Sequence, residues 1–345
     1  MNAPGRDDRQ PRRVYLLPAD LRLDTRDGDV VPLAGGPLAF AAVVRITRER
    51  DGVRRERLPW RDVADDPAFA ALTAPRPVPF DRPRLMGILN VTPDSFSDRG
   101  RFAEADAAVA QGLAMVGEGA DIVDVGGEST RPGAGEVPVE EELRRVLPVV
   151  ARLAAAGVAV SVDTRKGRVM REAVAAGASI INDVSGLSHD PEALAAAAAT
   201  GARVVLMHMR GEPATMNVAP SYAHAALEVF DELEARVLAA EAAGIPRGRI
   251  VVDPGLCFAK HEPHNLDVLR HLALYHGLGC PLLVGVSRKG WTAAIHERWR
   301  PAERLPATLA AGFWALQHGA TCLRVHDVAA HRQLLVAFEA LAGSA

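Results

Sequence analysis

Short apolar runs recur from residue 84 to the end of the chain, and each stops at a polar residue. The runs lie within residues 85–90, 119–128, 156–163, 176–183, 200–208, 247–253, 280–289 and 319–327. They are rich in Val, Ile and Leu and almost continuous in apolar character, which is typical of parallel strands buried on both faces. Segments with helical spacing, such as 140–157 and 225–244, separate them, and each of these two ends in the glycine expected just past a helix. Eight strand–helix units predict an α/β fold, a (β/α)8 or TIM barrel over residues 84–345, with an open doubly wound sheet as the alternative.

Residues 1–83 do not follow this pattern. The segment 41–60 alternates between apolar and polar residues around Asp51-Gly52, which predicts a β-hairpin. Residues 72–83 are rich in proline and are predicted to form a linker. We therefore expect an N-terminal extension with a β-hairpin that packs against or caps the barrel.

Composition and charge exclude several classes of function. The length of 345 residues suits a barrel with an appendage, and the net charge of −3 gives no basic surface for nucleic acid or for a membrane. Cys257, Cys280 and Cys322 lack the spacing of metal ligands and are expected to be reduced. The first residues carry no apolar signal-peptide run, and no run is long enough to cross a membrane. The sequence predicts a cytoplasmic protein with neither nucleic acid nor membrane as a partner.

In a (β/α)8 barrel the carboxyl ends of the strands build the active site. The polar residues at or near these ends are Asn90, Asp124, Glu128, Asp163, Asn182, Asp183, His208, Asp253, Lys289, Arg324 and His326. A carboxylate accepts two N–H bonds from an amino-pyrimidine edge, and an asparagine adds one donor and one acceptor. These residues therefore indicate a pocket for a flat heterocycle rich in hydrogen-bond donors.

Some of these residues also have a purely structural interpretation. Asp183 and Asp190 are expected to cap helices or turns, and Asp124, inside its run, is either a pocket residue or only buried and satisfied. His208 is either a packed histidine or a site residue.

Basic residues gather in the loops of the same segments: Arg131, Arg288, Lys289, Arg324 and His326. Such a set suits a phosphate or pyrophosphate, since the chain has no Walker-type glycine loop. The candidate metal ligands are oxygen donors without a Cys/His cluster, so the sequence favours Mg²⁺ over Zn²⁺.

A series of long motifs, in order, covers residues 84 to about 335. They are MGILNVTPDSFSD, DIVDVGGESTRPGA, SVDTRKGRV, ASIINDVSG, LMHMRGEPATM, VVDPGLCFAKHEPHNL, LLVGVSRKG and LRVHDV. With these motifs the chain closely resembles the dihydropteroate synthases, a family of pterin-binding barrels. The resemblance implies condensation of 6-hydroxymethyl-7,8-dihydropterin diphosphate with p-aminobenzoate, which gives 7,8-dihydropteroate and pyrophosphate, and it implies a homodimer.

The resemblance also assigns roles to individual residues. The positions that match the pterin site are Asp163, Asn182, Met207, Asp253, Lys289 and Arg324. Asn90 matches the ligand of a Mg²⁺ that holds the diphosphate, with Arg131 and His326 as its cationic partners. The positions that match the p-aminobenzoate site and its lid are Phe96, Thr130, Pro132, Phe258, Ser287 and Gly290. The groups expected to act in catalysis are Asn90, Arg131, Lys289, Arg324 and His326.

The chain departs from the family pattern around the second substrate. Gly290 stands where the family often has serine, and Trp291 stands where phenylalanine is usual. Cys257 and Ala259 replace glycines on either side of Phe258. These departures bear on the fit of p-aminobenzoate and leave the pterin positions intact.

Two other functions fit the same barrel. One is a methyltransferase that uses methyl-tetrahydrofolate, and the other is a non-catalytic pterin-binding or scaffold protein. The motifs TPDSFSD and STRPGA favour the synthase, because a methyltransferase has neither a diphosphate to bind nor an aminobenzoate to cover.

Overall fold

The structure is a computed structural model. It describes residues 13–23, 28–49, 52–77, 80–91, 101–129, 135–212, 215–216, 218–290, 299–300 and 303–342.

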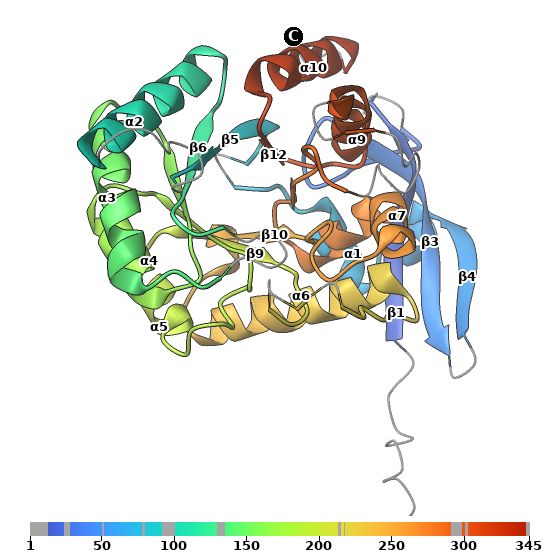
Figure 1. Ribbon diagram of the computed structural model, residues 1–345. Coiled ribbons are helices and arrows are strands. Elements are labelled where there is room, and N and C mark those ends of the chain that lie inside the picture. The colour runs from blue at the N-terminus through green and yellow to red at the C-terminus, as the bar shows by residue number, and fades with distance from the viewer. Residues whose placement is uncertain are drawn as a thin grey trace, which may run out of the picture.

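Eight parallel strands form the centre of the molecule (Figure 1). They are β5 (Arg84–Asn90), β6 (Ile122–Gly126), β7 (Val160–Asp163), β8 (Ile180–Asp183), β9 (Arg203–Met207), β10 (Ile250–Asp253), β11 (Leu283–Val284) and β12 (Cys322–Val325). Their order is β10-β9-β8-β7-β6-β5-β12-β11, and a parallel bridge from Val252 to Leu282 brings the two ends of this order together. The predicted barrel is confirmed, and each of the eight apolar runs contains one strand.

Helices surround the strands (Figure 1). They are α2 (Arg101–Gly117), α3 (Val139–Ala155), α4 (Gly167–Ala175), α5 (Ala193–Thr200), α6 (Ala225–Ala242), α7 (Glu262–Arg270), α9 (Leu305–Gln317) and α10 (Val328–Leu341), with 3-10 segments η3 (Arg247–Arg249) and η4 (Leu272–Leu278). Gly157 and Gly244 follow α3 and α6 with φ of 79° and 93°, as expected of C-capping glycines. Within the described ranges no helix is both long and apolar enough to span a membrane.

The barrel interior is apolar at the amino-terminal end of the strands. One cluster of buried side chains comes from the strands' amino-terminal halves and from the segment before β5: Phe80, Met86, Ile122, Ile180, Val205, Val251, Leu283 and Cys322. Phe80 is fully buried in this layer. With this end filled by hydrocarbon, polar side chains lie at the opposite, carboxyl end of the strands.

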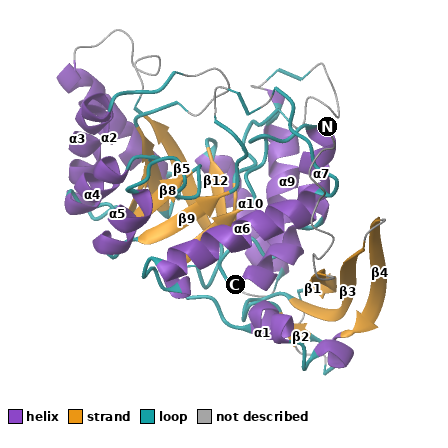
Figure 2. Ribbon diagram, turned by 90° about the horizontal axis from the view of Figure 1, so that it is seen from below, coloured by secondary structure: helices purple, strands orange, loops and turns teal. Residues whose placement is uncertain are grey.

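The N-terminal extension is a small antiparallel sheet at one side of the barrel (Figure 2). It contains β1 (Arg13–Arg22), β2 (Val31–Pro32), β3 (Ala39–Glu49) and β4 (Gly52–Pro59), followed by η1 (Trp60–Val63) and α1 (Pro67–Thr73). The predicted hairpin is the β3–β4 pair, whereas β1 was not predicted. Tyr15 of β1 packs on Phe230 of α6 with ring centroids 5.5 Å apart, and its hydroxyl donates to Asp231 at 2.9 Å. The extension thus shares a core with the barrel.

The proline-rich segment before the barrel is docked rather than free. Its Arg76 is buried, and the guanidinium donates to the carbonyls of Ala71 and Ala74 at 2.9 Å and of His276 at 3.0 Å. These bonds join the extension to η4. The division into an extension over 1–83 and a barrel over 84–345 stays a prediction.

Candidate active site

Residues at the carboxyl ends of four neighbouring strands lie in one row, in which three residues are polar and one is glycine. Asn90 of β5 pairs in register with Gly126 of β6, Gly126 with Asp163 of β7, and Asp163 with Asn182 of β8. Gly126 has no side chain, and a Cβ there would lie 3.6 Å from Asp163 Oδ2 and 3.7 Å from Asn90 Oδ1. Asn90 and Asp163 therefore border the same space, as the sequence predicts.

Arg324 of β12 reaches across this space to two carboxylates. Its Nε donates to Asp124 Oδ2 at 2.7 Å, and its Nη2 donates to Asp163 Oδ2 at 2.6 Å. Asn182 Nδ2 donates to the same oxygen of Asp124 at 3.0 Å. Of the two interpretations of Asp124, the structure therefore favours a site residue over one that is only buried and satisfied. Its position two residues before the strand end, on the face it shares with Gly126, is the sequence signal for this role.

The surroundings change the acidity of these groups. Burial raises the pKa of Asp163 to about 7, while the Arg324 guanidinium opposes that rise. Burial alone would lower the pKa of Arg324, but Asp124 and Asp163 hold it above its ordinary value. Asp124 Oδ1 is buried and has no hydrogen-bond donor among the described residues. A buried acceptor without a donor is costly, so this oxygen suits a ligand N–H.

Asp253 and Lys289 form the opposite part of the site. A Cβ at Gly285 would lie 3.3 Å from Lys289 Nζ and 4.0 Å from Asp253 Oδ2, which places both groups at this glycine. Burial raises the pKa of Asp253, and Lys289 opposes that rise. Burial lowers the pKa of Lys289, and Asp253 opposes that fall. The two side chains thus stabilise each other's charge in a region with little water.

Gly255 shapes the backbone next to Asp253. Its N–H donates to Asp253 Oδ1 at 2.7 Å, and its φ is 66°. A Cβ at this position would lie 2.0 Å from the carbonyl oxygen of His208, so only glycine fits.

The walls beside Asp253 are apolar. Met207 of β9 pairs in register with Asp253 and is buried. Lys289 Nζ lies 4.8 Å from the ring centroid of Phe258, a cation–π distance, and donates to the carbonyl of Leu256 at 2.8 Å. The structure therefore places Met207, the predicted wall of the pterin site, beside Asp253, and Phe258, predicted for the p-aminobenzoate site, beside Lys289.

Ser287 and His326 lie together between β11 and β12. The backbone N–H of His326 donates to Ser287 Oγ at 3.1 Å, and His326 Nδ1 lies 3.0 Å from the same oxygen. Arg288, another residue of the predicted phosphate cluster, pairs with the chain neighbour of His326, because its Nε donates to Asp327 at 2.9 Å. Gly290 is exposed, and a Cβ there would meet no atom within 4 Å.

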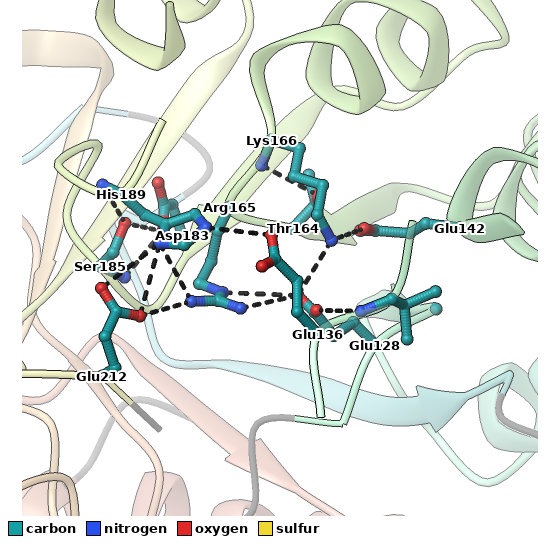
Figure 3. Close-up of polar contacts among 12 residues, drawn as sticks. Glu128, Glu136, Glu142, Thr164, Arg165, Lys166, Asp183, Ser185, His189 and Glu212 are labelled. Atoms are coloured by element: carbon teal, nitrogen blue, oxygen red, sulfur yellow. Dashed lines mark hydrogen bonds and ion pairs between the residues drawn. The ribbon is translucent and has the colours of Figure 1, made fainter. Parts of the chain in front are cut away.

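Four predicted site residues lie outside the described residues: Phe96, Thr130, Arg131 and Pro132. Both ends of the loop that contains the last three are described (Figure 3). Glu128 Oε1 accepts the backbone N–H of Val137 at 2.8 Å, so one carboxylate joins the loop's two ends.

A buried ion-pair network holds that carboxylate in place (Figure 3). Glu128 Oε2 lies 3.1 Å from Arg165 Nη2 and 3.2 Å from Lys166 Nζ. Lys166 also pairs with Glu142 at 2.6 Å, and Arg165 pairs with Glu212 at 2.9 Å. These contacts join the loops after β6, β7 and β9.

The expected capping roles are confirmed. Asp183 accepts the N–H groups of Ser185 and Leu187, and Asp190 accepts those of Gly167 and Glu192. His208 is buried, with a partner at each ring nitrogen, as a packed histidine would be. No group of three or more His, Cys, Asp or Glu in the described part of the chain could hold a metal ion.

Comparison with known proteins identifies the family. The model of the pterin binding enzymes matches residues 86–326. The dihydropteroate synthase of Escherichia coli K12 is 49% identical over 247 residues, which are 71% of this chain and 87% of that protein. A probable bifunctional folylpolyglutamate synthase/dihydropteroate synthase of Haloferax volcanii is 50% identical over 72% of this chain, but the match spans only 29% of that longer protein.

Solved structures of dihydropteroate synthases are also similar to this chain. The dihydropteroate synthase of Xanthomonas albilineans with 4-aminobenzoic acid is 50% identical, with a TM-score of 0.71, and the match covers 76% of this chain and 94% of that one. The same enzyme in complex with 7,8-dihydropteroate aligns with a TM-score of 0.68 and 45% identity over 76% of this chain and 94% of that one. The chain belongs to the pterin-binding enzyme family, and within it to the dihydropteroate synthases.

Proposed function

We propose that this chain condenses 6-hydroxymethyl-7,8-dihydropterin diphosphate with p-aminobenzoate to give 7,8-dihydropteroate and pyrophosphate. The observation that carries the proposal is the buried group formed by Asp124, Asp163, Asn182 and Arg324. Relatives bound to 4-aminobenzoic acid and to 7,8-dihydropteroate support both substrates.

The pterin is the natural ligand for this arrangement of donors and acceptors. Its amino-pyrimidine edge presents several N–H groups, which carboxylates such as Asp253 and Asp124 accept. Arg324 is held by two carboxylates with its guanidinium over the space, where it can stack on a flat ring. Met207 gives this space an apolar wall.

The diphosphate needs positive charge as it leaves. We propose that Asn90 holds a Mg²⁺, which neutralises the diphosphate oxygens when bound. A single amide oxygen suits an ion that keeps most of its ligands from water and phosphate, and the described residues offer no Cys/His cluster that would favour zinc. His326 and Arg131 are the proposed cationic partners of the leaving group.

The second substrate then completes the reaction. The C–O bond at the pterin methylene breaks with its electron pair leaving on pyrophosphate, and the aniline nitrogen of p-aminobenzoate forms the new C–N bond and releases a proton. A neutral aryl amine is nucleophilic without a strong base, so no Ser or Cys nucleophile is required. We propose that p-aminobenzoate is held by Phe96, Thr130, Pro132, Phe258, Ser287 and Gly290.

The test is pyrophosphate release by the purified chain from the pterin diphosphate, with and without p-aminobenzoate. We expect release to depend on p-aminobenzoate and on added Mg²⁺, and 7,8-dihydropteroate to appear in equal amount. Methyl transfer from methyl-tetrahydrofolate without pyrophosphate release would instead establish the methyltransferase.

We further propose a cytoplasmic homodimer. Both parts of this proposal rest on membership of the dihydropteroate synthase family and on the sequence analysis. Light scattering of the purified chain measures the molecular mass directly, and a monomer at micromolar concentration would contradict the dimer.

A further inference from the structure

The loop after β10, residues 254–260, has an unusual backbone. Gly255, Cys257 and Ala259 have left-handed φ angles of 66°, 65° and 51°. Two of these residues are not glycine, and L side chains resist this conformation. Such a backbone persists only where surrounding contacts hold it in place.

Lys260 supplies these contacts from within the loop itself. Its side chain is only 3% exposed. Its Nζ donates to the carbonyls of Gly255 at 2.9 Å and Phe258 at 3.1 Å, and it lies 2.7 Å from His208 Nδ1. Three close acceptors match the three donors of an ammonium group. The lysine therefore folds back and closes its own loop.

His208 links this ammonium to helix α6. When Lys260 is protonated it can only donate to Nδ1, so the ring then carries its proton on Nε2, which lies 3.0 Å from Glu232 Oε2. Burial lowers the pKa of His208 to about 4, so the ring is neutral at pH 7. A neutral imidazole thus joins a cation and a carboxylate and fixes the position of both.

The closed loop carries groups that reach the pterin site. The N–H of Gly255 donates to Asp253 at 2.7 Å, and the carbonyl of Leu256 accepts Lys289 Nζ at 2.8 Å. Both contacts arise inside the span that Lys260 closes. A loop that relaxed would move the acceptor of Lys289 and the donor of Asp253 together.

We propose that Lys260 is a positioning residue, which orients Asp253 and Lys289 toward the pterin by closing the loop between them. The proposal deepens the proposed function and rests on it for the identity of the ligand. The contacts within the loop are independent of that identity.

The test compares Lys260→Met with a matched control, Arg76→Met. Arg76 is also a buried cation that donates to three backbone carbonyls, but these lie in the extension and η4. Burial lowers the pKa of Lys260 to about 7, with Asp253 opposing, so the assays are made at about pH 6.5. We expect Lys260→Met to lower kcat/KM for the pterin diphosphate at least about tenfold, and Arg76→Met to change it less than about twofold at a similar loss of melting temperature.

Hydrogen exchange provides a readout without turnover. We expect the amides of Gly255 and Cys257 to exchange at least about tenfold faster in Lys260→Met than in the wild type, and to keep their protection in Arg76→Met. If the wild-type chain turns over no pterin substrate, the proposed function fails. The loop is then still tested by the amide exchange and by nitrogen NMR, which observes the Nε2-protonated tautomer of His208.

Two results would overturn the proposal. One is a folded Lys260→Met protein with unchanged kcat/KM and unchanged amide protection. The other is equal loss of kcat/KM in Lys260→Met and Arg76→Met, which would mean that stability alone is responsible. Should Lys260→Met not fold, Glu232→Ala keeps the lysine and removes the acceptor of His208. That variant must then show the same faster exchange and lower kcat/KM, and wild-type values would overturn the proposal.

Discussion

Arg324 and Asp124 lie 200 residues apart in the chain and meet at 2.7 Å, with Asp124 fully buried and Arg324 partly exposed. The carboxylate has one oxygen on the guanidinium and the other without a donor among the described residues. Asp124 therefore both holds Arg324 and presents an acceptor to the ligand.

Asp124→Asn should weaken pterin binding more than it weakens the fold. The amide keeps the shape of the side chain. It replaces one acceptor oxygen with an NH2 donor, and it removes the negative charge opposite Arg324. We expect a loss of about 2 kcal/mol in pterin affinity, about thirtyfold, because a hydrogen bond to a charged group is lost. Calorimetry with a pterin ligand measures it, and wild-type affinity in a folded variant would remove Asp124 from the site.

Asp253→Ala should abolish most pterin binding. The substitution removes the carboxylate proposed to accept the amino-pyrimidine edge, and the expected loss is on the order of 2–3 kcal/mol, about two orders of magnitude in affinity. The control is Asp121→Ala, since Asp121 accepts the N–H of Leu85 and pairs with Arg332 at the other end of the strands. This control should lower stability and leave pterin affinity unchanged.

Glu128→Ala should destabilise the protein far more than removal of an exposed ion pair. It leaves the buried cations Arg165 and Lys166 short of one partner and frees the N–H of Val137. Breaking a buried pair costs about 3–5 kcal/mol, whereas an exposed pair contributes less than about 1 kcal/mol. Urea unfolding of Glu128→Ala and of Glu192→Ala, which removes the exposed pair of Glu192 with Arg171, makes the comparison. Equal losses would show that the network contributes no more than a surface pair.

Gly290→Ser should improve the fit of p-aminobenzoate. A Cβ at Gly290 meets no atom within 4 Å, so the hydroxyl has room on the side of the described residues. A hydrogen bond to a carboxylate contributes about 1.5–3 kcal/mol when buried and less in a wet site. We expect the KM for p-aminobenzoate to fall several-fold with little change for the pterin diphosphate. If the KM for the pterin diphosphate changes instead, residue 290 does not lie at the carboxylate of p-aminobenzoate.

The barrel was predictable because its signals are local. Each strand is an apolar run that stops at a polar residue, and both properties are visible without knowing which strands are neighbours. Asn90, Asp163, Asn182 and Asp253 follow from the same rule, since parallel strands bring their carboxyl ends together.

The features that were not predicted depend on distant contacts. The buried guanidinium of Arg76 donates a hydrogen bond to the carbonyl of His276, 200 residues away, and nothing near Arg76 in the sequence signals this. Two acceptors of Lys260 are backbone carbonyls, which do not depend on side-chain type, and the third is His208, 52 residues away, so its burial has no local sequence signal. The ion pair of Asp124 with Arg324, 200 residues away, likewise has no local sequence signal.

Acid should weaken the attachment of the extension through His276. This ring is fully buried beside Arg76, and its Nε2 lies 3.1 Å from the carbonyl oxygen of His318. Burial lowers the pKa of His276 to about 3, and the positive charge of Arg76 acts in the same direction. In the unfolded chain this histidine has its ordinary pKa of 6.5, so the unfolded chain takes up more protons than the folded protein between about pH 6.5 and 3.

This difference in proton uptake means that acid destabilises the folded protein. The stabilisation by the neutral His276 ring is complete above about pH 6.5 and is lost progressively as the pH falls toward 3, with an upper limit of about 5 kcal/mol. His276→Gln cannot take up this proton, so its stability should fall less steeply over the same range. His208, whose pKa is lowered to about 4, is present in both proteins and cancels in the comparison. Urea unfolding of the two proteins from pH 7 to 4 measures the difference, and parallel curves would show that His276 does not contribute to the acid sensitivity.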